Sequence, residues 1–522
     1  MPKVIGIGKQ RYDRIIENDG FYIDKTMFIK EWWENQDDVT LITRPRRFGK
    51  TLNMDMLKCF FSNEYKDRGD LFEGLDIWKE EKYREIQGTY PVIFLSFAKI
   101  KQNTYKDAIA GIKRIICDEI QKYIFLKDWD GLADAEKNNL KNITYGMDDV
   151  TAQEAIASLS NYLSRYYGKN VIILLDEYDT PMQEAYVNGY LEELVSFTRS
   201  FFNATFKSNL YLERAVITGI TRVSKESIFS DLNNLKVITV ESDEYSDTFG
   251  FSEEEVFLAL DDFNLSDKKQ IVKEWYDGFT FGSQRDIYNP WSIINFLENK
   301  KIDTYWADTS SNSLINHLIK KSVPEIKELM ELLLKRESIE VTFDDQIVFN
   351  QLDKSKNAIW SLLVASGYLK IDDIEYKGLL LKPWYHISIT NLETVSMFAN
   401  MFAGWFENPD ARYNDFIKSL LNNDLKGMNY YMNKVALATF SYFDTGKNPS
   451  ETLEPERFYH GFVLGLIVEL SDRYEVKSNR ESGFGRYDVM IIPLDKSEKA
   501  IVLEFKVHEN DEEKTLEETV SS

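Results

Sequence analysis

The feature that most constrains this fold is a basic loop between a short apolar run and a helical pattern. The run VTLIT at residues 39–43 predicts a buried strand, and apolar residues recur at helical spacing from residue 51 to residue 62. Between them lies RPRRFGKT, residues 44–51. A strand, a glycine-containing turn, a Lys-Thr pair and a helix in this order form the context that a phosphate-binding loop requires. An ordinary glycine turn after a basic strand end is the alternative, but it does not explain why all four features occur together.

The residues of this loop match the parts of Mg²⁺-bound ATP. Backbone N–H groups and the helix N-terminus favour phosphate, and Lys50 would add positive charge at the β and γ phosphates. The Thr51 hydroxyl would ligate Mg²⁺. Arg44 departs from the general pattern, which has Gly at the first loop position. Arg46 and Arg47 either assist the phosphates or lie solvated beside them. We therefore expect ATP and Mg²⁺ as cofactors.

A second apolar run ends in acidic residues. VIILLDEYD, residues 171–179, predicts a buried strand with Asp176 at its end and Glu177 next. Strand ends at the switch point of a parallel sheet face the nucleotide. We expect Asp176 to hold Mg²⁺ through water and Glu177 to polarise the attacking water. Asp179 is expected to cap the helix that begins at Thr180.

The remaining strands of the first half complete a sheet. The strand that carries Ile217 and Thr218 is followed by GITR, residues 219–222, which places Thr218, Thr221 or Arg222 where a sensor of the γ-phosphate would sit. A plain turn is the alternative. With crossover helices between them, the strands predict a doubly wound parallel α/β sheet of the P-loop NTPase kind. The further strands are expected at residues 91–97, 212–219 and 236–240.

Composition excludes several classes of protein. The 522 residues suggest two to four domains, and 86 acidic against 63 basic residues give a net charge of -23. This field repels nucleic-acid phosphates and anionic membranes, so any DNA or RNA binding must be local. Only Cys59 and Cys117 are present, which fits a reducing compartment. With no signal-peptide pattern and no long uncharged apolar run, we expect a cytoplasmic protein without a membrane partner.

The second half predicts two further domains. After an ATPase domain at residues 1–250, the pattern of residues 251–410 turns helical. Within it, residues 358–371 predict a helix, a glycine turn and a strand, which favours a helical or winged-helix-like lid. Residues 411–522 predict a small α/β domain. Its expected elements are a helix at residues 458–470 and two strands, YDVMIIP and AIVLEFKV.

These features together resemble a known family, the AAA-ATPase-like proteins of bacteria, whose usual C-terminal partner is a PD-(D/E)XK nuclease superfamily domain. The resemblance covers essentially the whole chain, and the Arg at the first loop position belongs to the family's own pattern. It also implies a role for Arg222 near the γ-phosphate. The matching motifs are YIDKT (22–26), RPRRFGKTLNMDML (44–57), LLDEYDTP (174–181), TGITRVSKESIFSDLNN (218–234), WYDGF (275–279) and YNPWS (288–292). The expected nucleotide-binding set is Arg44, Arg47, Phe48, Gly49, Lys50, Thr51, Asp176 and Arg222.

The last two expected strands carry a second candidate site. Glu504 and Lys506 are two residues apart and therefore share one face of a strand, while Asp488 can approach from the paired strand. Asp488 and Glu504 would hold Mg²⁺ against a scissile phosphate, and Lys506 would stabilise charge or orient water. Glu469 is a further candidate ligand. A polar strand face with an ion pair is the alternative. Only 16 residues (522 minus 506) follow Lys506, fewer than the superfamily core usually has.

Two functions follow from the sequence. The first is an enzyme in which ATP hydrolysis drives or gates a metal-dependent nuclease-like domain that acts on DNA or RNA. The alternative is a nucleotide-switched interaction protein whose C-terminal domain binds without cutting. The sequence leaves the oligomeric state open, a homo-oligomer included.

Overall fold

The computed structural model divides the chain into two compact units. One unit comprises Met1–Lys321 with Ser338–Thr394, and the other comprises Ser322–Glu337 with Val395–Ser522. The predicted boundaries at residues 250 and 410 stay predictions. The residues described are 3–221, 228–229, 231–307, 315, 318–319, 324–334, 336–343, 357–405, 419–430, 474–482, 485–495 and 499–503.

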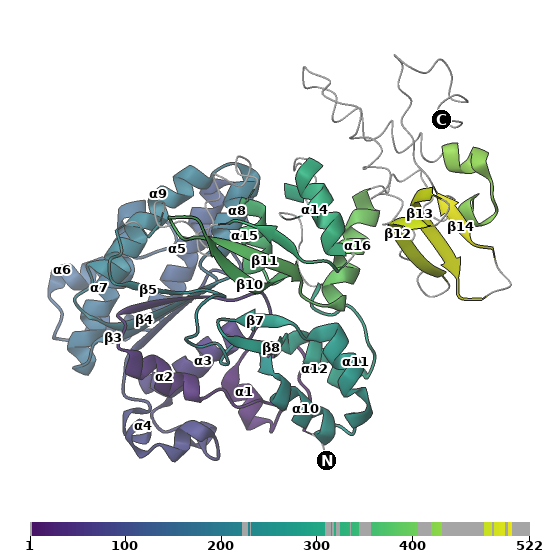
Figure 1. Cartoon of the computed structure of the whole chain (residues 1–522). Coiled ribbons are helices and arrows are strands. Elements are labelled where there is room, and N and C mark those ends of the chain that lie inside the picture. The colour runs from purple at the N-terminus through teal and green to yellow at the C-terminus, as the bar shows by residue number, and fades with distance from the viewer. Residues whose placement is uncertain are drawn as a thin grey trace. The chain divides into compact units, whose positions relative to one another are not determined.

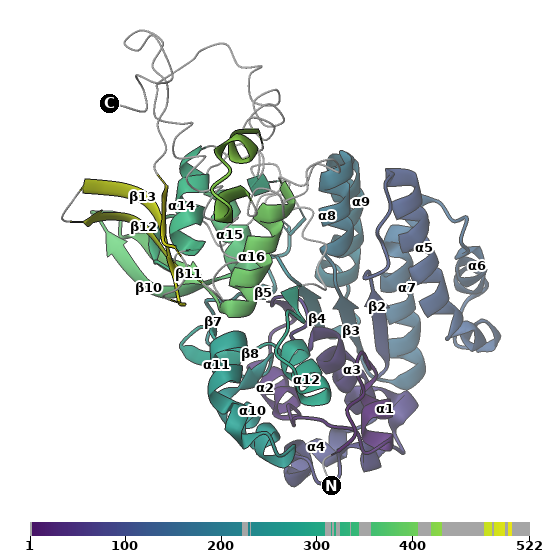
Figure 2. The ribbon, with the colours of Figure 1, turned by 90° about the vertical axis from the view of Figure 1, so that its right-hand side faces the viewer.

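A five-stranded parallel sheet forms the centre of the first unit (Figure 1). Its order is β2-β3-β4-β1-β5, so β4 lies between the strands that carry the phosphate loop and the acidic end. All residues of β1 and β3 are buried, as expected for strands covered on both faces, and Figure 2 shows helices around the sheet. The predicted α/β fold class is confirmed. The strands are β1 (Val39–Thr43), β2 (Val92–Ser96), β3 (Val171–Asp176), β4 (Leu212–Gly219) and β5 (Leu235–Ile238).

The helices between these strands begin and end at residues that local chemistry favours. The Asp148 side chain accepts a hydrogen bond from the Thr151 N–H at the start of α7, and Gly168 ends that helix in the left-handed conformation. Gly49, also left-handed, precedes α3 directly after the loop. The helices are α1 (Tyr12–Glu17), α2 (Met27–Asn35), α3 (Lys50–Phe61), α4 (Glu81–Ile86), α5 (Tyr105–Gln121), α6 (Asp134–Asn142), α7 (Asp149–Tyr167), α8 (Thr180–Asn188) and α9 (Leu191–Phe202).

Two small sheets complete the first unit. Their strand orders are β6-β8-β7 and β10-β11-β9, and every pair is antiparallel. The predicted helix, glycine turn and strand at residues 358–371 are confirmed, since Gly367 has a φ of +81° between α15 and β10. The elements are β6 (Phe251–Ser252), α10 (Glu253–Asp262), α11 (Lys269–Tyr276), β7 (Phe279–Phe281), β8 (Gln284–Tyr288), α12 (Pro290–Asn299), β9 (Ile339–Val341), α15 (Ala358–Ala365), β10 (Leu369–Lys377) and β11 (Lys382–Ile389). The helix α16 (Leu392–Trp405) begins in this unit, and its residues from Val395 onward belong to the second unit.

The sequence interpretation of this region as mainly helical was incomplete. It missed most strands of the two small sheets because β6, β7 and β9 span only two or three residues each. Such runs are too short for the alternation of apolar and polar residues that identifies a strand. β10 is longer, but most of its residues are partly or fully exposed and its sequence is largely polar.

The second unit contains a three-stranded antiparallel sheet. Its order is β12-β13-β14, with bounds Tyr474–Ser482, Gly485–Pro493 and Ile501–Leu503. The two predicted strands correspond to β13 and β14, whereas β12 was not predicted. α14 (Pro324–Leu334) also belongs to this unit. The helix predicted at residues 458–470 lies outside the described residues.

A buried carboxylate joins distant segments of the first unit. Glu393 is fully buried, accepts a hydrogen bond of 2.8 Å from the Ser292 hydroxyl, and accepts bonds of 2.6 and 3.4 Å from the N–H groups of Trp306 and Ala307. Burial raises the pKa of Glu393 to about 7, although these hydrogen bonds oppose the rise. The carboxyl group therefore binds a proton more readily in the folded state than in the unfolded chain.

We predict that Glu393→Gln changes the pH dependence of stability. Because the folded pKa lies above the ordinary 4.5, the wild type should lose stability relative to the variant as the pH rises from about 4.5 to 7. The 2.5 units of difference bound this loss at roughly 3 kcal/mol. Urea unfolding of both proteins across this range measures it. Glu274→Gln, on an exposed position of α11, is the control, and a constant difference between wild type and Glu393→Gln would contradict the prediction.

Candidate nucleotide-binding site

The loop between β1 and α3 presents unpaired backbone donors. Arg47 and Gly49 both have left-handed backbones, with φ of +66° and +79°. No described backbone carbonyl accepts a hydrogen bond from the N–H groups of residues 46–52. A Cβ placed on Gly49 would have no atom within 4 Å, so the space above the loop is open. Successive unpaired N–H groups at a helix N-terminus form an anion-binding concavity, which fits the phosphates of a nucleotide.

Lys50 is held inside this loop. Its side chain is buried, and Nζ donates hydrogen bonds of 2.9 and 2.7 Å to the carbonyl oxygens of Arg44 and Pro45. Burial lowers the pKa of Lys50, while the nearby carboxylates of Glu177 and Asp176 act in the opposite direction. The ammonium group is thus already positioned at the loop that was predicted to bind phosphate.

Asp176 connects three elements at the carboxyl edge of the sheet. The Thr51 hydroxyl of α3 donates to its Oδ2 at 2.8 Å, and the Thr218 hydroxyl at the end of β4 donates to its Oδ1 at 2.6 Å. Asp176 is fully buried, and burial raises its pKa while both hydroxyls oppose the rise. The two residues predicted to bind Mg²⁺, Thr51 and Asp176, therefore contact each other directly. Thr218 lies at the same point, near the end of the strand that was predicted to carry it.

Glu177 has an unusual backbone. Its φ is +52°, a left-handed conformation that is uncommon for a residue with a side chain. The Thr180 hydroxyl donates to Glu177 Oε2 at 3.1 Å, and the Glu177 N–H contacts the Thr218 hydroxyl oxygen at 3.4 Å. Strained backbones of this kind persist where the surrounding contacts enforce them, and they cluster at functional sites.

The expected capping role of Asp179 was wrong. Asp179 precedes α8, but its side chain makes no capping hydrogen bond. Instead, its Oδ2 accepts bonds from the N–H groups of Ile220 and Thr221 at 3.0 and 2.9 Å, and from the Thr221 hydroxyl at 2.8 Å. The buried carboxylate thus fixes the turn after β4. Local sequence could not reveal this partner because it lies more than forty residues away along the chain.

The Arg44 side chain is buried in the protein, and its expected nucleotide contact stays a prediction. The guanidinium is fully buried and donates to the carbonyls of Thr43 and Thr239 at 3.0 and 2.6 Å. Weaker contacts of 3.4 Å reach two further carbonyls, and the Phe281 ring lies 4.6 Å from the guanidinium carbon. Burial lowers the pKa of Arg44 to about 9. Arg44 therefore fastens β1 to the segment after β5, and its carbonyl holds Lys50.

The neighbouring loop side chains contact aromatic rings of β7 and α12. Phe48 is buried and packs edge-on against Phe279 at 4.8 Å and Phe281 at 5.4 Å between ring centroids. The exposed Arg47 lies over the Trp291 ring at 4.3 Å. The predicted nucleotide contacts of Arg47 and Phe48 can therefore come from their backbone N–H groups, because the side chains are engaged elsewhere. Phe279 belongs to the motif WYDGF and Trp291 to the motif YNPWS, for which the sequence alone indicated no role.

Arg46 borders a pocket beside the loop. Its guanidinium donates to the Gln183 side chain at 3.2 Å, and the pocket is also lined by Glu184, Ile220 and Leu362. The sequence left Arg46 either at the phosphates or in solvent. The structure places it half-buried at the rim of this pocket.

Several predicted site residues cannot be placed. Arg222, Glu469, Glu504 and Lys506 lie outside the described residues. Asp488 lies in β13, although its side chain is not among those described. These roles stay predictions.

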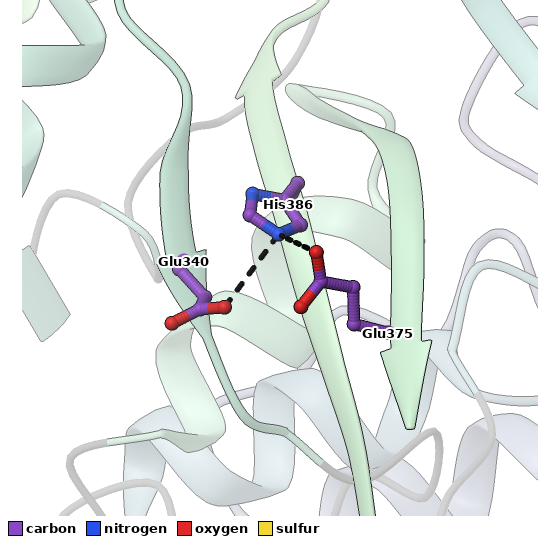
Figure 3. Close-up of side chains that lie close together, drawn as sticks. All are labelled: Glu340, Glu375 and His386. Atoms are coloured by element: carbon purple, nitrogen blue, oxygen red, sulfur yellow. Dashed lines mark ion pairs between the residues drawn. The ribbon is translucent and has the colours of Figure 1, made fainter. Parts of the chain in front are cut away.

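A separate charged cluster occupies the β10-β11-β9 sheet (Figure 3). His386 Nε2 lies 3.5 Å from Glu340 Oε1 and 3.6 Å from Glu375 Oε1. Lys377 pairs with both carboxylates as well, at 3.3 Å to Glu375 Oε2. These side chains are partly exposed, so we interpret the cluster as a solvated ion-pair group that sequence reasoning did not find.

Comparison with known proteins supports the resemblance. Residues 6–229 match the family described as Predicted AAA-ATPase. This region of the chain is therefore similar to the AAA-ATPase-like family. Residues 454–521 match the PD-(D/E)XK nuclease superfamily.

Two individual proteins are similar to this chain. One, from Azotobacter chroococcum mcd 1, is described as "Uncharacterized protein in vnfD 5'region" and is 25% identical over 504 residues, which cover 94% of this chain and 87% of that protein. The other is the structure of the Aeropyrum pernix ORC2 protein in its ADPNP-ADP complexes. It is 10% identical and covers 73% of this chain and 93% of that chain, with a TM-score of 0.25. A score this low carries no argument about this chain.

Within the part of the chain that the structure describes, no helix combines the length and apolar character needed to cross a membrane.

We predict that the two arginines of the AAA-ATPase-like loop differ in their effect on stability. Arg44→Met should lower the free energy of unfolding by at least about 2 kcal/mol because it leaves buried carbonyls without their donor. Arg47→Met removes only an exposed ring contact and should cost less than about 1 kcal/mol. Chemical denaturation of both variants measures the difference. Equal losses would show that the buried hydrogen bonds of Arg44 contribute little.

Proposed function

We propose that this chain binds and hydrolyses ATP with Mg²⁺ at the loop between β1 and α3, and that nucleotide turnover controls a metal-dependent nuclease-like region acting on DNA or RNA. The observation that carries the first part is the 2.8 Å hydrogen bond between the Thr51 hydroxyl and Asp176. It joins the helix that follows the phosphate loop to the acidic end of a neighbouring strand. This is where a hydroxyl and a carboxylate must meet to hold Mg²⁺.

The residues at this site fit a Mg²⁺-nucleotide. Unpaired N–H groups and the buried Lys50 ammonium supply positive charge for the phosphates, while Thr51 and Asp176 supply oxygen ligands for Mg²⁺. When bound, Mg²⁺ would neutralise phosphate charge. Lys50 now donates to two loop carbonyls, and exchanging these for phosphate oxygens would release the loop to close around the nucleotide. Hydrogen bonds to charged phosphate are the stronger ones.

Hydrolysis requires a group that orients water, and Glu177 is the proposed one. Its left-handed backbone turns it out of the strand directly after Asp176, and its side chain is only partly buried. A partly exposed carboxylate beside the phosphate site can accept a proton from an attacking water. We propose Arg222 as the group nearest the γ-phosphate. The anchoring of Ile220 and Thr221 by Asp179 supports this role because it fixes the backbone immediately before Arg222.

The nuclease-like assignment rests on the superfamily match and on the pairing of β13 with β14. Val489 pairs with Leu503 in an antiparallel register. We propose that this register continues by one residue, which would set Asp488 opposite Glu504. Directly opposite residues on antiparallel strands point to the same face. Both carboxylates could then hold one Mg²⁺, with Lys506 on the same face as Glu504.

The interaction-protein alternative draws support from charge. A net charge of -23 opposes association with nucleic acid unless a local basic surface compensates. In this alternative function, the bound nucleotide would change the affinity of the C-terminal region for a partner, and no nucleic acid would be cleaved. Nuclease activity is the property that separates the two functions.

We predict that two substitutions separate binding from hydrolysis. Lys50→Ala should abolish ATP turnover and weaken nucleotide binding because it removes the charge beside the β and γ phosphates. Glu177→Gln should keep Mg²⁺-ATP binding but slow turnover by at least roughly a hundredfold. Phosphate release and fluorescent-nucleotide titration measure these effects. Lys58→Ala, on the same helix, is the control. Unchanged hydrolysis in Lys50→Ala would refute the ATPase assignment, and loss of binding in Glu177→Gln would make Glu177 a structural residue.

We predict that Asp488→Asn and Glu504→Gln each abolish Mg²⁺- or Mn²⁺-dependent cleavage of DNA or RNA while ATP hydrolysis persists. Each change removes one of two carboxylates needed for the proposed metal site, whereas the ATPase residues come from the first unit. Cleavage assays with mixed single- and double-stranded substrates, run beside the phosphate-release assay, measure both activities. Glu475→Gln, on an exposed position of β12, is the control. A wild type that cuts nothing with any divalent metal and ATP would favour the interaction protein.

A further inference from the structure

Three carboxylates from separate elements converge beside the β6-β8-β7 sheet. Glu253 begins α10, Asp277 follows α11 directly, and Asp286 lies in β8. One oxygen atom of each lies within 4.8 Å of the others. These elements are labelled in Figure 1, and all belong to the first unit. Asp277 is the acidic residue of WYDGF, a motif to which the proposed ATPase and nuclease chemistry gives no role.

Asp277 is a buried carboxylate with one oxygen that lacks a hydrogen-bond donor in the part of the chain that the structure describes. The residue is only 8% exposed, and its Oδ1 has no hydrogen-bond partner among the described residues. A buried carboxylate oxygen without a donor is costly unless a proton or a cation binds it.

The positive charge already present does not balance the cluster. Lys273 Nζ pairs with Glu253, and it lies 3.7 Å from Asp286 Oδ1 and 3.9 Å from Asp277 Oδ2. The Tyr288 hydroxyl adds one neutral donor to Glu253 at 3.3 Å. Three carboxylates and one ammonium leave a local formal charge of -2 (three times -1, plus 1). A single divalent cation would neutralise it.

We propose that Glu253, Asp277 and Asp286 bind one divalent cation of the oxygen-preferring class, Mg²⁺, Ca²⁺ or Mn²⁺. Carboxylate oxygens are the ligands these ions prefer, and water would complete the coordination. Asp286 is exposed and borders an open groove lined also by Glu253 and Glu254, so an ion can enter from solvent. Lys273 is 37% exposed on its side chain, and its flexible stem lets the ammonium move out toward solvent when the ion binds.

The cluster in Figure 3 does not support the same inference. Its carboxylates, Glu340 and Glu375, are both paired with Lys377, and both are partly exposed. Neither of them is a buried acid that lacks a partner. The unpartnered oxygen of Asp277 is therefore the observation that distinguishes the proposed cation site.

The proposed ion would stabilise the segment between α11 and β7, which packs against the loop that follows β1. Gly278 follows Asp277 and packs so closely that an added Cβ would lie 2.2 Å from the Thr390 carbonyl oxygen. Phe279 comes next, and its ring packs on Phe48 of the loop. A cation that joins Asp277 to α10 and β8 would thus fix the end of α11 and the start of β7 where they carry the loop. The site is structural and lies apart from the reacting phosphates.

The test is Mn²⁺ binding to the full chain in the absence of nucleotide. Asp488→Asn serves as the background, so that neither the proposed nuclease metal nor a nucleotide-bound ion contributes. After removal of metal with EDTA, the free Mn²⁺ signal in electron paramagnetic resonance gives the bound number. We expect about one Mn²⁺ per chain that is lost in Asp277→Asn, and at least about tenfold weaker binding in Asp286→Asn. Mn²⁺ should raise the unfolding temperature of the background protein but not of Asp277→Asn.

Control variants make the result decisive. Asp267→Asn removes an exposed carboxylate that pairs with Lys268 just before α11, and it should leave Mn²⁺ binding unchanged. If Asp277→Asn fails to fold, Glu253→Gln and the exposed Asp286→Asn carry the test. Unchanged Mn²⁺ binding in these variants would overturn the proposal and make Asp277 and Asp286 a pair that shares a proton. Because no nucleotide is used, this failure is distinct from a failure of the ATPase assignment.

Discussion

The candidate site depends on one buried carboxylate. Asp176 has no exposed surface, and burying its charge is costly unless donors compensate. Hydroxyl donors from Thr51 and Thr218 meet this requirement, and they come from α3 and β4. The sheet order makes this possible, because β4 lies directly between β1 and β3. A change in strand order would separate the phosphate loop from the acidic strand end, and the local motifs would then have no common site.

The phosphate loop is also fixed from outside the main sheet. Arg44 reaches backbone carbonyls after β5, and Phe48 packs into the aromatic side chains of β7. The loop N–H groups stay free of described backbone partners while the side chains anchor the loop. Because the backbone N–H groups and the side chains of the loop have separate roles, an Arg whose side chain is buried can occupy the first loop position. It also links the motifs RPRRFGKT and WYDGF, which are far apart in sequence, through direct packing and through the proposed cation at Asp277.

The nuclease-like assignment of the C-terminal region depends on a superfamily match and on the pairing of two strands. Residues 454–521 match the PD-(D/E)XK nuclease superfamily, and β12, β13 and β14 form an antiparallel sheet within this range. The pairing of Val489 with Leu503 gives the proposed metal site a specific register. The coupling of the two regions is therefore a proposal about function, tested by activities that can be lost one at a time.

The sequence by itself determined the strands of the main sheet, the loop before α3 and the acidic end of β3, because periodicity and turn chemistry are local. It also indicated Lys50, Thr51, Asp176 and Thr218 as neighbours of one site, because parallel strands end at one edge of a sheet. Only the tertiary structure decided where the side chains of Arg44 and Asp179 point. Their partners lie 195 and 41 residues away, and no local pattern encodes such contacts. For the same reason, the sequence did not predict that Glu253, Asp277 and Asp286 lie close together. These residues come from different parts of the chain and meet only when α10, α11 and β8 pack together.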